Sequence, residues 1–178
     1  MHWKLRREQL MFVGVVLSAL VFVRPVSAGR PKPAHPYRYS VVDMPVSLAI
    51  GTVQTPEFSV VKNGWHWIMI QVEKPLPFDQ MMCMMGTASS RLDLKYCSGN
   101  DPLLRADWVA YEDGHIVLNG SSTSTGADMY DSRYIFKFIG SFPVLSGKKY
   151  VVEVKFTKDG TPLNVANPHL IIVRHGEE

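Results

Sequence analysis

The stretch that decides the fold is Glu57–Val72, which reads EFSVVKNGWHWIMIQV. It holds two runs rich in β-branched and aromatic residues, and such residues favour β-strands. The two runs are separated by Asn63-Gly64, a dipeptide that tolerates the positive φ angles of a tight hairpin turn. The stretch therefore predicts a β-hairpin that turns at Asn63-Gly64.

The second run of this stretch is apolar on both sides. Because side chains alternate along a strand, its two faces hold Trp65, Trp67, Met69 and Gln71 on one side and His66, Ile68, Ile70 and Val72 on the other. A strand of this kind is expected either in a sheet covered on both faces or beside a partly exposed aromatic patch.

Short runs of the same type recur along the chain, separated by turn residues. We expect strands at Tyr37–Val42, Val46–Ile50, Leu92–Cys97, Tyr134–Ile139, Tyr150–Thr157 and Leu170–Arg174, with a second hairpin over Trp108–Leu118 that turns at Asp113-Gly114. Asp159-Gly160 is a further expected turn. Phe78–Met85 is predicted as a strand with a local helix as the alternative, and Pro102–Ala106 is a second place for local helix. About eight to ten short antiparallel strands predict an all-β sandwich.

The sequence around Tyr150 sharpens this prediction. Leu145-Ser146-Gly147-Lys148-Lys149-Tyr150 leads into a strand with strict alternation, and it resembles the tyrosine corner of Greek-key sandwiches, in which the phenol bonds back to nearby backbone. The stretch Tyr134–Val173, about a quarter of the chain, resembles the closing strands of immunoglobulin-like domains in small secreted bacterial proteins. The resemblance implies an immunoglobulin-like, Greek-key β-sandwich and no activity.

Residues 1–28 have the three parts of a secretory signal peptide: a basic start, an apolar stretch at Leu10–Val23, and small residues at Val26-Ser27-Ala28. The apolar stretch is shorter than the about 20 residues that span a bilayer. We therefore expect cleavage after Ala28, no stable membrane anchor, and a protein that is periplasmic or secreted. A proline-rich linker is expected at 29–36, one domain at 37–174 and a disordered tail at 175–178.

The net charge of the chain comes from this leader. The sequence has 19 Lys and Arg and 16 Asp and Glu, and residues 1–28 hold four of the bases and one of the acids, which leaves 15 of each. A nucleic-acid-binding protein needs a basic face that releases counterions. The neutral remainder supplies no such face, so this class of protein is excluded.

Two cysteines, Cys83 and Cys97, remain after cleavage. In an oxidising compartment such a pair is expected to form a disulfide, and closing a loop of about 15 residues stabilises the fold by roughly 3 kcal/mol. The alternatives are two buried free thiols or a thiolate site. Their close spacing in the sequence differs from the inter-sheet bridge of antibody domains.

The sequence predicts no metal site from its methionine, cysteine and histidine side chains. Met81-Met82-Cys83-Met84-Met85 contains soft ligands for Cu(I), but a strand would turn at most three of them to one face, and Met also fills irregular cores. The histidines lie far apart, without zinc spacing. We expect core packing for this run and no cofactor.

The sequence contains no nucleophile signature and no phosphate loop. Asp128 and Asp131, close to Arg133, are weak calcium candidates or a carboxylate pair for glycoside cleavage, although two loop acids beside an arginine are more often solvated or ion-paired. No catalytic residue is predicted, and a hydrolase is the third hypothesis.

Aromatic side chains are the remaining functional candidates, because Trp and Tyr anchor protein partners and stack on sugar rings. The candidates are Trp65, Trp67, Trp108, Tyr111 and Tyr130, and the tryptophans have core packing as their alternative role. The leading hypothesis is a non-enzymatic binding module that engages another envelope or secreted protein, as an inhibitor, an immunity-like protein or an accessory subunit. The alternative is a carbohydrate-binding module.

Overall fold

The computed structural model describes residues 40–85, 103–122 and 129–176. All of them belong to one compact unit, Ala34–Glu178. The expected signal peptide, the proline-rich linker, the strand at Leu92–Cys97, the loop residue Asp128 and the last two residues of the tail lie outside the described residues. No helix in the described ranges is long and apolar enough to cross a membrane.

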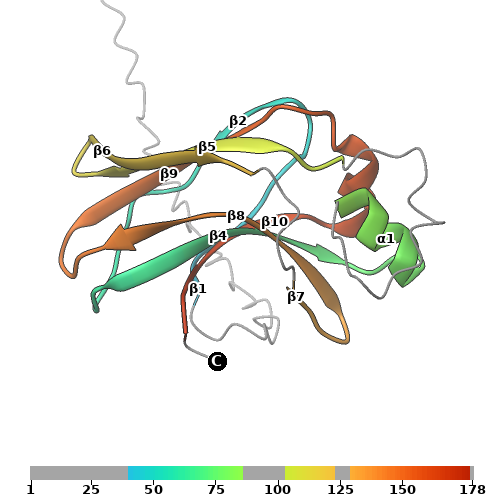
Figure 1. Ribbon diagram of the computed structural model, residues 1–178, viewed down its shortest axis with the longest axis horizontal. Coiled ribbons are helices and arrows are strands. Elements are labelled where there is room, and N and C mark those ends of the chain that lie inside the picture. The colour runs from blue at the N-terminus through green and yellow to red at the C-terminus, as the bar shows by residue number, and fades with distance from the viewer. Residues whose placement is uncertain (1–39, 86–102, 123–128, 177–178) are drawn as a thin grey trace, which may run out of the picture. The chain divides into compact units, whose positions relative to one another are not determined.

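Two antiparallel sheets pack face to face, as Figure 1 shows. The first, called here the β4 sheet, runs in the order β1 (Ser40–Pro45), β10 (His169–Arg174), β4 (Gly64–Glu73), β8 (Tyr134–Val144) and β7 (Met129–Tyr130). The second, the β9 sheet, runs in the order β2 (Gly51–Gln54), β9 (Lys149–Phe156), β5 (Ala106–Glu112) and β6 (His115–Ser121), with β3 (Phe58–Ser59) also paired to β9. The predicted all-β sandwich is confirmed.

The main core lies between the sheets and follows the two-residue period of the strands. Ile68, Ile70 and Val72 of β4 belong to the same buried cluster as Val152 and Val154 of β9. The opposite face of β4 is also apolar, since a second buried cluster contains Met69, Tyr134, Phe136, Ile171 and Val173, with Trp67 and Met129 against it. The prediction that β4 has two apolar faces is therefore confirmed.

The indole of Trp108 joins the two sheets. Two glycines leave room for the ring: Gly120, the cross-strand partner of Trp108 on β6, and Gly140 of β8. A Cβ at Gly140 would lie 2.2 Å from the ring, and a Cβ at Gly120 would lie 3.0 Å from it. Real Cβ atoms do not approach other atoms as closely as 2.2 Å. The glycine at position 140 is therefore required by the packing of Trp108.

The predicted hairpin over Trp108–Leu118 is confirmed, because β5 pairs with β6 and Glu112 lies opposite His115. The predicted hairpin at Asn63-Gly64 is wrong. β3 pairs with β9, whereas β4 pairs with β8 and β10 in the other sheet. The chain crosses between the sheets at this dipeptide.

The segment Phe78–Met85 is an eight-residue helix, α1, so the strand prediction is wrong and the local-helix alternative is correct. Pro77 precedes it, and the Pro77 carbonyl accepts a hydrogen bond from the Met81 amide at 3.1 Å. Met81, Met82 and Met85 are buried in the main core. The expected core packing of this sulfur-rich run is therefore observed, on a helix and not on a strand.

Three other sequence-based boundaries need correction. Val46–Ile50 is not a strand, because Leu48 is buried and bonds through its backbone to Asn164 and Gly160. Leu103–Arg105 is not helical, and β5 begins at Ala106. A 3₁₀ helix, η2 (Thr161–Ala166), follows the predicted turn at Asp159-Gly160 and was not expected.

Candidate functional site

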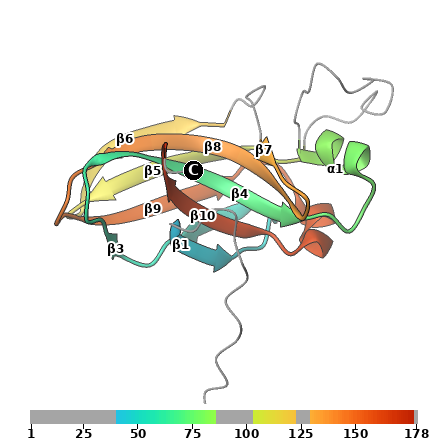
Figure 2. The same ribbon diagram turned by 90° about the horizontal axis from the view of Figure 1, so that it is seen from below.

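Three chain turns meet at one end of the sandwich, at the left of Figure 1, and we call this the turn end. They are residues 60–63 before β4, Asp113-Gly114 between β5 and β6, and residues 145–148 between β8 and β9. Figure 2 shows α1 at the opposite end of the same sandwich. The turn end therefore brings together segments that are far apart in the sequence.

Hydrogen bonds join the first and third of these turns. The Ser146 amide donates to Asn63 Oδ1 at 2.7 Å, and the Ser146 hydroxyl donates to the Val61 carbonyl at 3.0 Å. The Gly147 amide donates to the Val60 carbonyl at 3.2 Å. Backbone groups that have fixed partners lose little further freedom on binding, so these two turns form a preorganised surface.

The predicted hydrogen bond from Tyr150 to nearby backbone is present at the base of the turn end. Its phenol oxygen accepts from the Leu145 amide at 2.7 Å and donates to Glu112 Oε2 at 2.5 Å. Burial, and then the hydrogen bond to Glu112, raise the pKa of Tyr150. The phenol therefore stays protonated at neutral pH and ties the turn before β9 to the end of β5.

Two lysines at the turn end, Lys148 and Lys149, are paired with acids. Lys148 Nζ lies 2.9 Å from Asp113 and 3.7 Å from Glu112, and Lys149 Nζ lies 2.8 Å from Glu57. The hydrogen bond between Lys148 and Asp113 raises the pKa of Lys148 and lowers the pKa of Asp113. These cations are already neutralised by acids of the same chain.

Large apolar side chains stand exposed on this hydrogen-bonded surface. Val61 is 89% exposed, Trp65 is 51% exposed and Leu145 is 51% exposed. Exposed Pro143 is the cross-strand partner of Trp65. We call Val61, Trp65, Pro143 and Leu145 the turn-end patch. Large contiguous apolar patches with polar rims are one signature of interaction sites on protein surfaces.

Trp67 supports this patch from the next position on the same face of β4. Its ring packs edge-on against Phe138 at 6.0 Å and lies 4.5 Å from the ring of His175. The His175 amide donates to the Trp65 carbonyl at 2.9 Å. These contacts hold the backbone that presents Trp65.

The structure separates the other predicted aromatic residues from this patch. Trp108 is only 6% exposed and lies in the main core, so it has the packing role that was its alternative. Tyr111 lies on the outer face of the β9 sheet opposite Ile116. Tyr130 is 60% exposed on β7, which pairs with the end of β8 farthest from the turn end. Of the five candidates, only Trp65 and Trp67 lie together.

Val61, Pro143 and Leu145 were missed as site residues by sequence reasoning. The available signal was their position: Val61 and Leu145 are the last apolar residues before polar turns, and Pro143 lies two residues before Leu145. What could not be seen was that β4 and β8 bring these turns together.

Among the described residues, the predicted calcium candidates do not form a metal site. Asp131 is a turn residue, because its Oδ1 accepts from the Arg133 and Tyr134 amides at 2.6 and 2.7 Å. Asp128 lies outside the described residues, and within those residues no group of three His, Cys, Asp or Glu could hold a metal ion. Cys83 is buried in α1. Cys97 is outside the described residues, so the disulfide stays a prediction.

No protein-family model and no curated protein matches this chain. A solved crystal structure of a protein from Sulfurospirillum deleyianum is similar, with a TM-score of 0.57 over 76% of this chain and 98% of that chain, at 9% sequence identity. At this identity the likeness shows a common fold and carries no activity from one protein to the other.

Proposed function

We propose that this protein is an exported, non-enzymatic binding module that engages another envelope or secreted protein through the turn-end patch. The roles that fit are an inhibitor, an immunity-like protein or an accessory subunit. Export is proposed from the leader at residues 1–28, and the absence of a nucleophile motif in the sequence supports a non-enzymatic role. The compartment would be the periplasm or the exterior of the cell.

The observation that carries this proposal is the half-exposed indole of Trp65 on a surface of mutually bonded turns. Leaving such a ring in water forgoes the stabilisation of burying it, which for a large apolar side chain is about 1.5–3 kcal/mol. Tryptophan is enriched among the few interface residues that contribute most of the binding energy. Since the turns are already ordered, binding costs little conformational entropy.

The test is a pull-down from envelope extract of the native host, with the protein tagged at its C-terminus and recovered as the host processes it. We expect one stoichiometric protein partner, identified by mass spectrometry. Trp65→Ala should weaken its binding by at least about 30-fold, since hot-spot substitutions cost 2 kcal/mol or more.

Tyr130→Ala is the matched control, because Tyr130 is also an exposed aromatic residue but lies far from the turn end. It should leave the affinity unchanged, and circular dichroism should show both variants folded. A partner held equally well by Trp65→Ala would refute the turn-end patch as the contact surface. Failure to recover any partner after cross-linking would refute the protein-binding function.

A further inference from the structure

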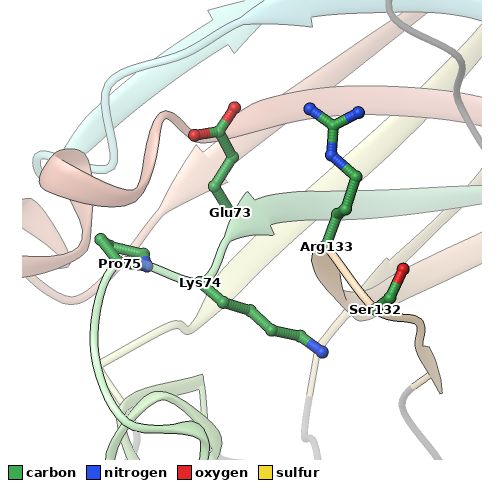
Figure 3. Close-up of a pocket in the computed structure, with 5 residues that line it drawn as sticks. All are labelled: Glu73, Lys74, Pro75, Ser132 and Arg133. Atoms are coloured by element: carbon green, nitrogen blue, oxygen red, sulfur yellow. The ribbon is translucent and has the colours of Figure 1, made fainter.

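A cavity of about 280 Å³ lies at the end of the β4 sheet that is opposite the turn end. It is lined by Glu73, Lys74, Pro75, Ser132 and Arg133, and Figure 3 shows these side chains. Glu73 is the last residue of β4, and Lys74 and Pro75 follow it. Ser132 and Arg133 belong to the turn between β7 and β8. Two chain segments thus bring a hydroxyl, a carboxylate and two cations to one hollow.

The two cations of this cavity differ from those of the turn end. Lys74 Nζ donates to the carbonyl oxygen of Asp131 and lies 5.1 Å from the Phe78 ring and 5.5 Å from the Tyr130 ring. The Arg133 guanidinium lies 5.5 Å from the Tyr134 ring. Among the described residues, neither cation has a carboxylate within ion-pair distance. Positive charge is therefore available for an anion.

The turn that carries Ser132 and Arg133 is held in place by Asp131. Its carboxylate accepts the two backbone hydrogen bonds described above, and its amide donates to the Tyr134 carbonyl at 3.1 Å. A carboxylate used in this way stabilises the turn that presents Arg133. The cavity is preorganised, which lowers the cost of binding a ligand.

Glu73 gives the cavity an acceptor as well as its cations. Figure 3 shows its carboxylate on the same side of the cavity as the Arg133 guanidinium, whereas Lys74 extends in another direction. Its carboxylate accepts a long hydrogen bond, 3.5 Å, from Asn167 Nδ2. An exposed carboxylate beside an exposed guanidinium can accept from ligand hydroxyls while the guanidinium binds a ligand carboxylate.

We propose that this cavity binds the carboxylate of a small acidic ligand, and that a uronic acid residue of a glycan is the class that fits. The planar fork of Arg133 suits bidentate carboxylate recognition, Ser132 offers a hydroxyl, and Glu73 accepts from sugar hydroxyls. Tyr130, 60% exposed and beside Lys74, supplies an aromatic face for the sugar ring. The site is separate from the turn-end patch and does not depend on it.

The experiment is an isothermal titration of the protein, as its host processes it, with glucuronate and galacturonate at low ionic strength. Glucose, galactose, acetate and inorganic phosphate are titrated in parallel. We expect the uronates to bind at least 10-fold more tightly than the neutral sugars and than acetate, with an affinity that falls as salt is added.

Arg133→Gln should weaken uronate binding at least 10-fold, and Arg133→Lys should recover only part of the loss because the fork is missing. Lys155→Gln, which removes an exposed cation from β9, is the matched control and should change nothing. Amide NMR shifts upon binding should centre on Ser132 and Arg133.

Each other result overturns a stated part of the inference. Equal binding of uronates and neutral sugars would refute carboxylate recognition. Equal binding of acetate or phosphate would refute a sugar site and leave a simple anion pocket. The absence of saturable uronate binding, or uronate binding that Arg133→Gln leaves intact, would refute the assignment altogether.

Discussion

Asn63-Gly64 and Asp113-Gly114 are two similar dipeptides at the same end of the molecule, and they do different things. Asp113 and Gly114 have φ angles of 48° and 83°, as a tight hairpin turn requires at both central residues. At the other dipeptide only Gly64 has a positive φ, 151°, and Asn63 does not. The first dipeptide reverses the chain within one sheet, and the second lies where the chain crosses between sheets.

The difference shows that a dipeptide permits a turn but does not choose the strands on either side. β3 is short, and its Phe58 packs against Tyr150 of its partner strand with ring centroids 6.0 Å apart. β4 pairs along its whole length with β8. The Asn63 side chain meanwhile accepts from Ser146, far away in the sequence. Long-range pairing overrides the local preference at Asn63.

The largest expected effect tests whether the Asp113 hairpin depends on long-range packing too. Gly140→Ala places a Cβ within 2.2 Å of the Trp108 ring on that hairpin. Since neither the ring nor the strand can move freely, we expect the free energy of unfolding to fall by about 3 kcal/mol, which is the upper part of the range for overpacking. Urea unfolding measures it.

Gly120→Ala is the control for this substitution, because its Cβ would lie 3.0 Å from the same ring. It should cost clearly less than Gly140→Ala. Equal losses of stability in the two variants would show that the Trp108 ring moves aside, and that the hairpin is held by its own turn.

An effect of intermediate size on stability is expected from substitutions at Gly64 and Gly114, because their backbone conformations differ. Asn is tolerated in the left-handed helical region near the φ of 83° at Gly114, but not at the φ of 151° at Gly64. We expect Gly64→Asn to destabilise by about 1–3 kcal/mol and Gly114→Asn to be nearly neutral. Thermal denaturation of the two variants, side by side, tests this, and the reverse order would contradict the assigned conformations.

The smallest effects separate the two residues that precede these glycines. Asn63→Ala removes the acceptor of the Ser146 amide, and the expected loss of about 1 kcal/mol should not depend on pH. Asp113 differs because its hydrogen bond with Lys148 holds the pKa of its carboxyl below the usual range. Its contribution is present above the unfolded pKa and is lost as the pH falls through the lower, folded pKa.

Chemical denaturation between pH 2 and pH 7 therefore distinguishes the two variants. The stability gap between wild type and Asp113→Ala should narrow as the pH falls below about 4, the unfolded pKa of Asp. The gap for Asn63→Ala should stay constant. A gap for Asp113→Ala that does not change with pH would mean that its charge contributes nothing to stability.

Much of the fold follows from short-range sequence pattern. The alternation in β4 predicts both of its apolar faces, and the resemblance of Leu145–Tyr150 to a tyrosine corner implies the phenol hydrogen bond. Whether a tryptophan is buried does not follow from such patterns. Trp108 is buried because Gly140, on a distant strand, leaves space for its ring, whereas Trp65 lies beside Pro143 and stays exposed.

The candidate site shows the same boundary between local and long-range information. Trp65 could be chosen from its type and its position after Asn63-Gly64. Its neighbours in the patch depend on the register between β4 and β8, which no local pattern contains. The cavity at Arg133 likewise depends on the meeting of two segments about 60 residues apart.

The bonds between residues 60–63 and 145–148 also have a mechanical meaning. At both places the chain passes from one sheet to the other, from β3 to β4 and from β8 to β9. The hydrogen bonds of Ser146 and Gly147 thus connect the two segments that cross between the sheets. A tensile force applied at Trp65 would therefore be distributed over both sheets of the sandwich. Separating the two sheets at this end would first require these hydrogen bonds to break.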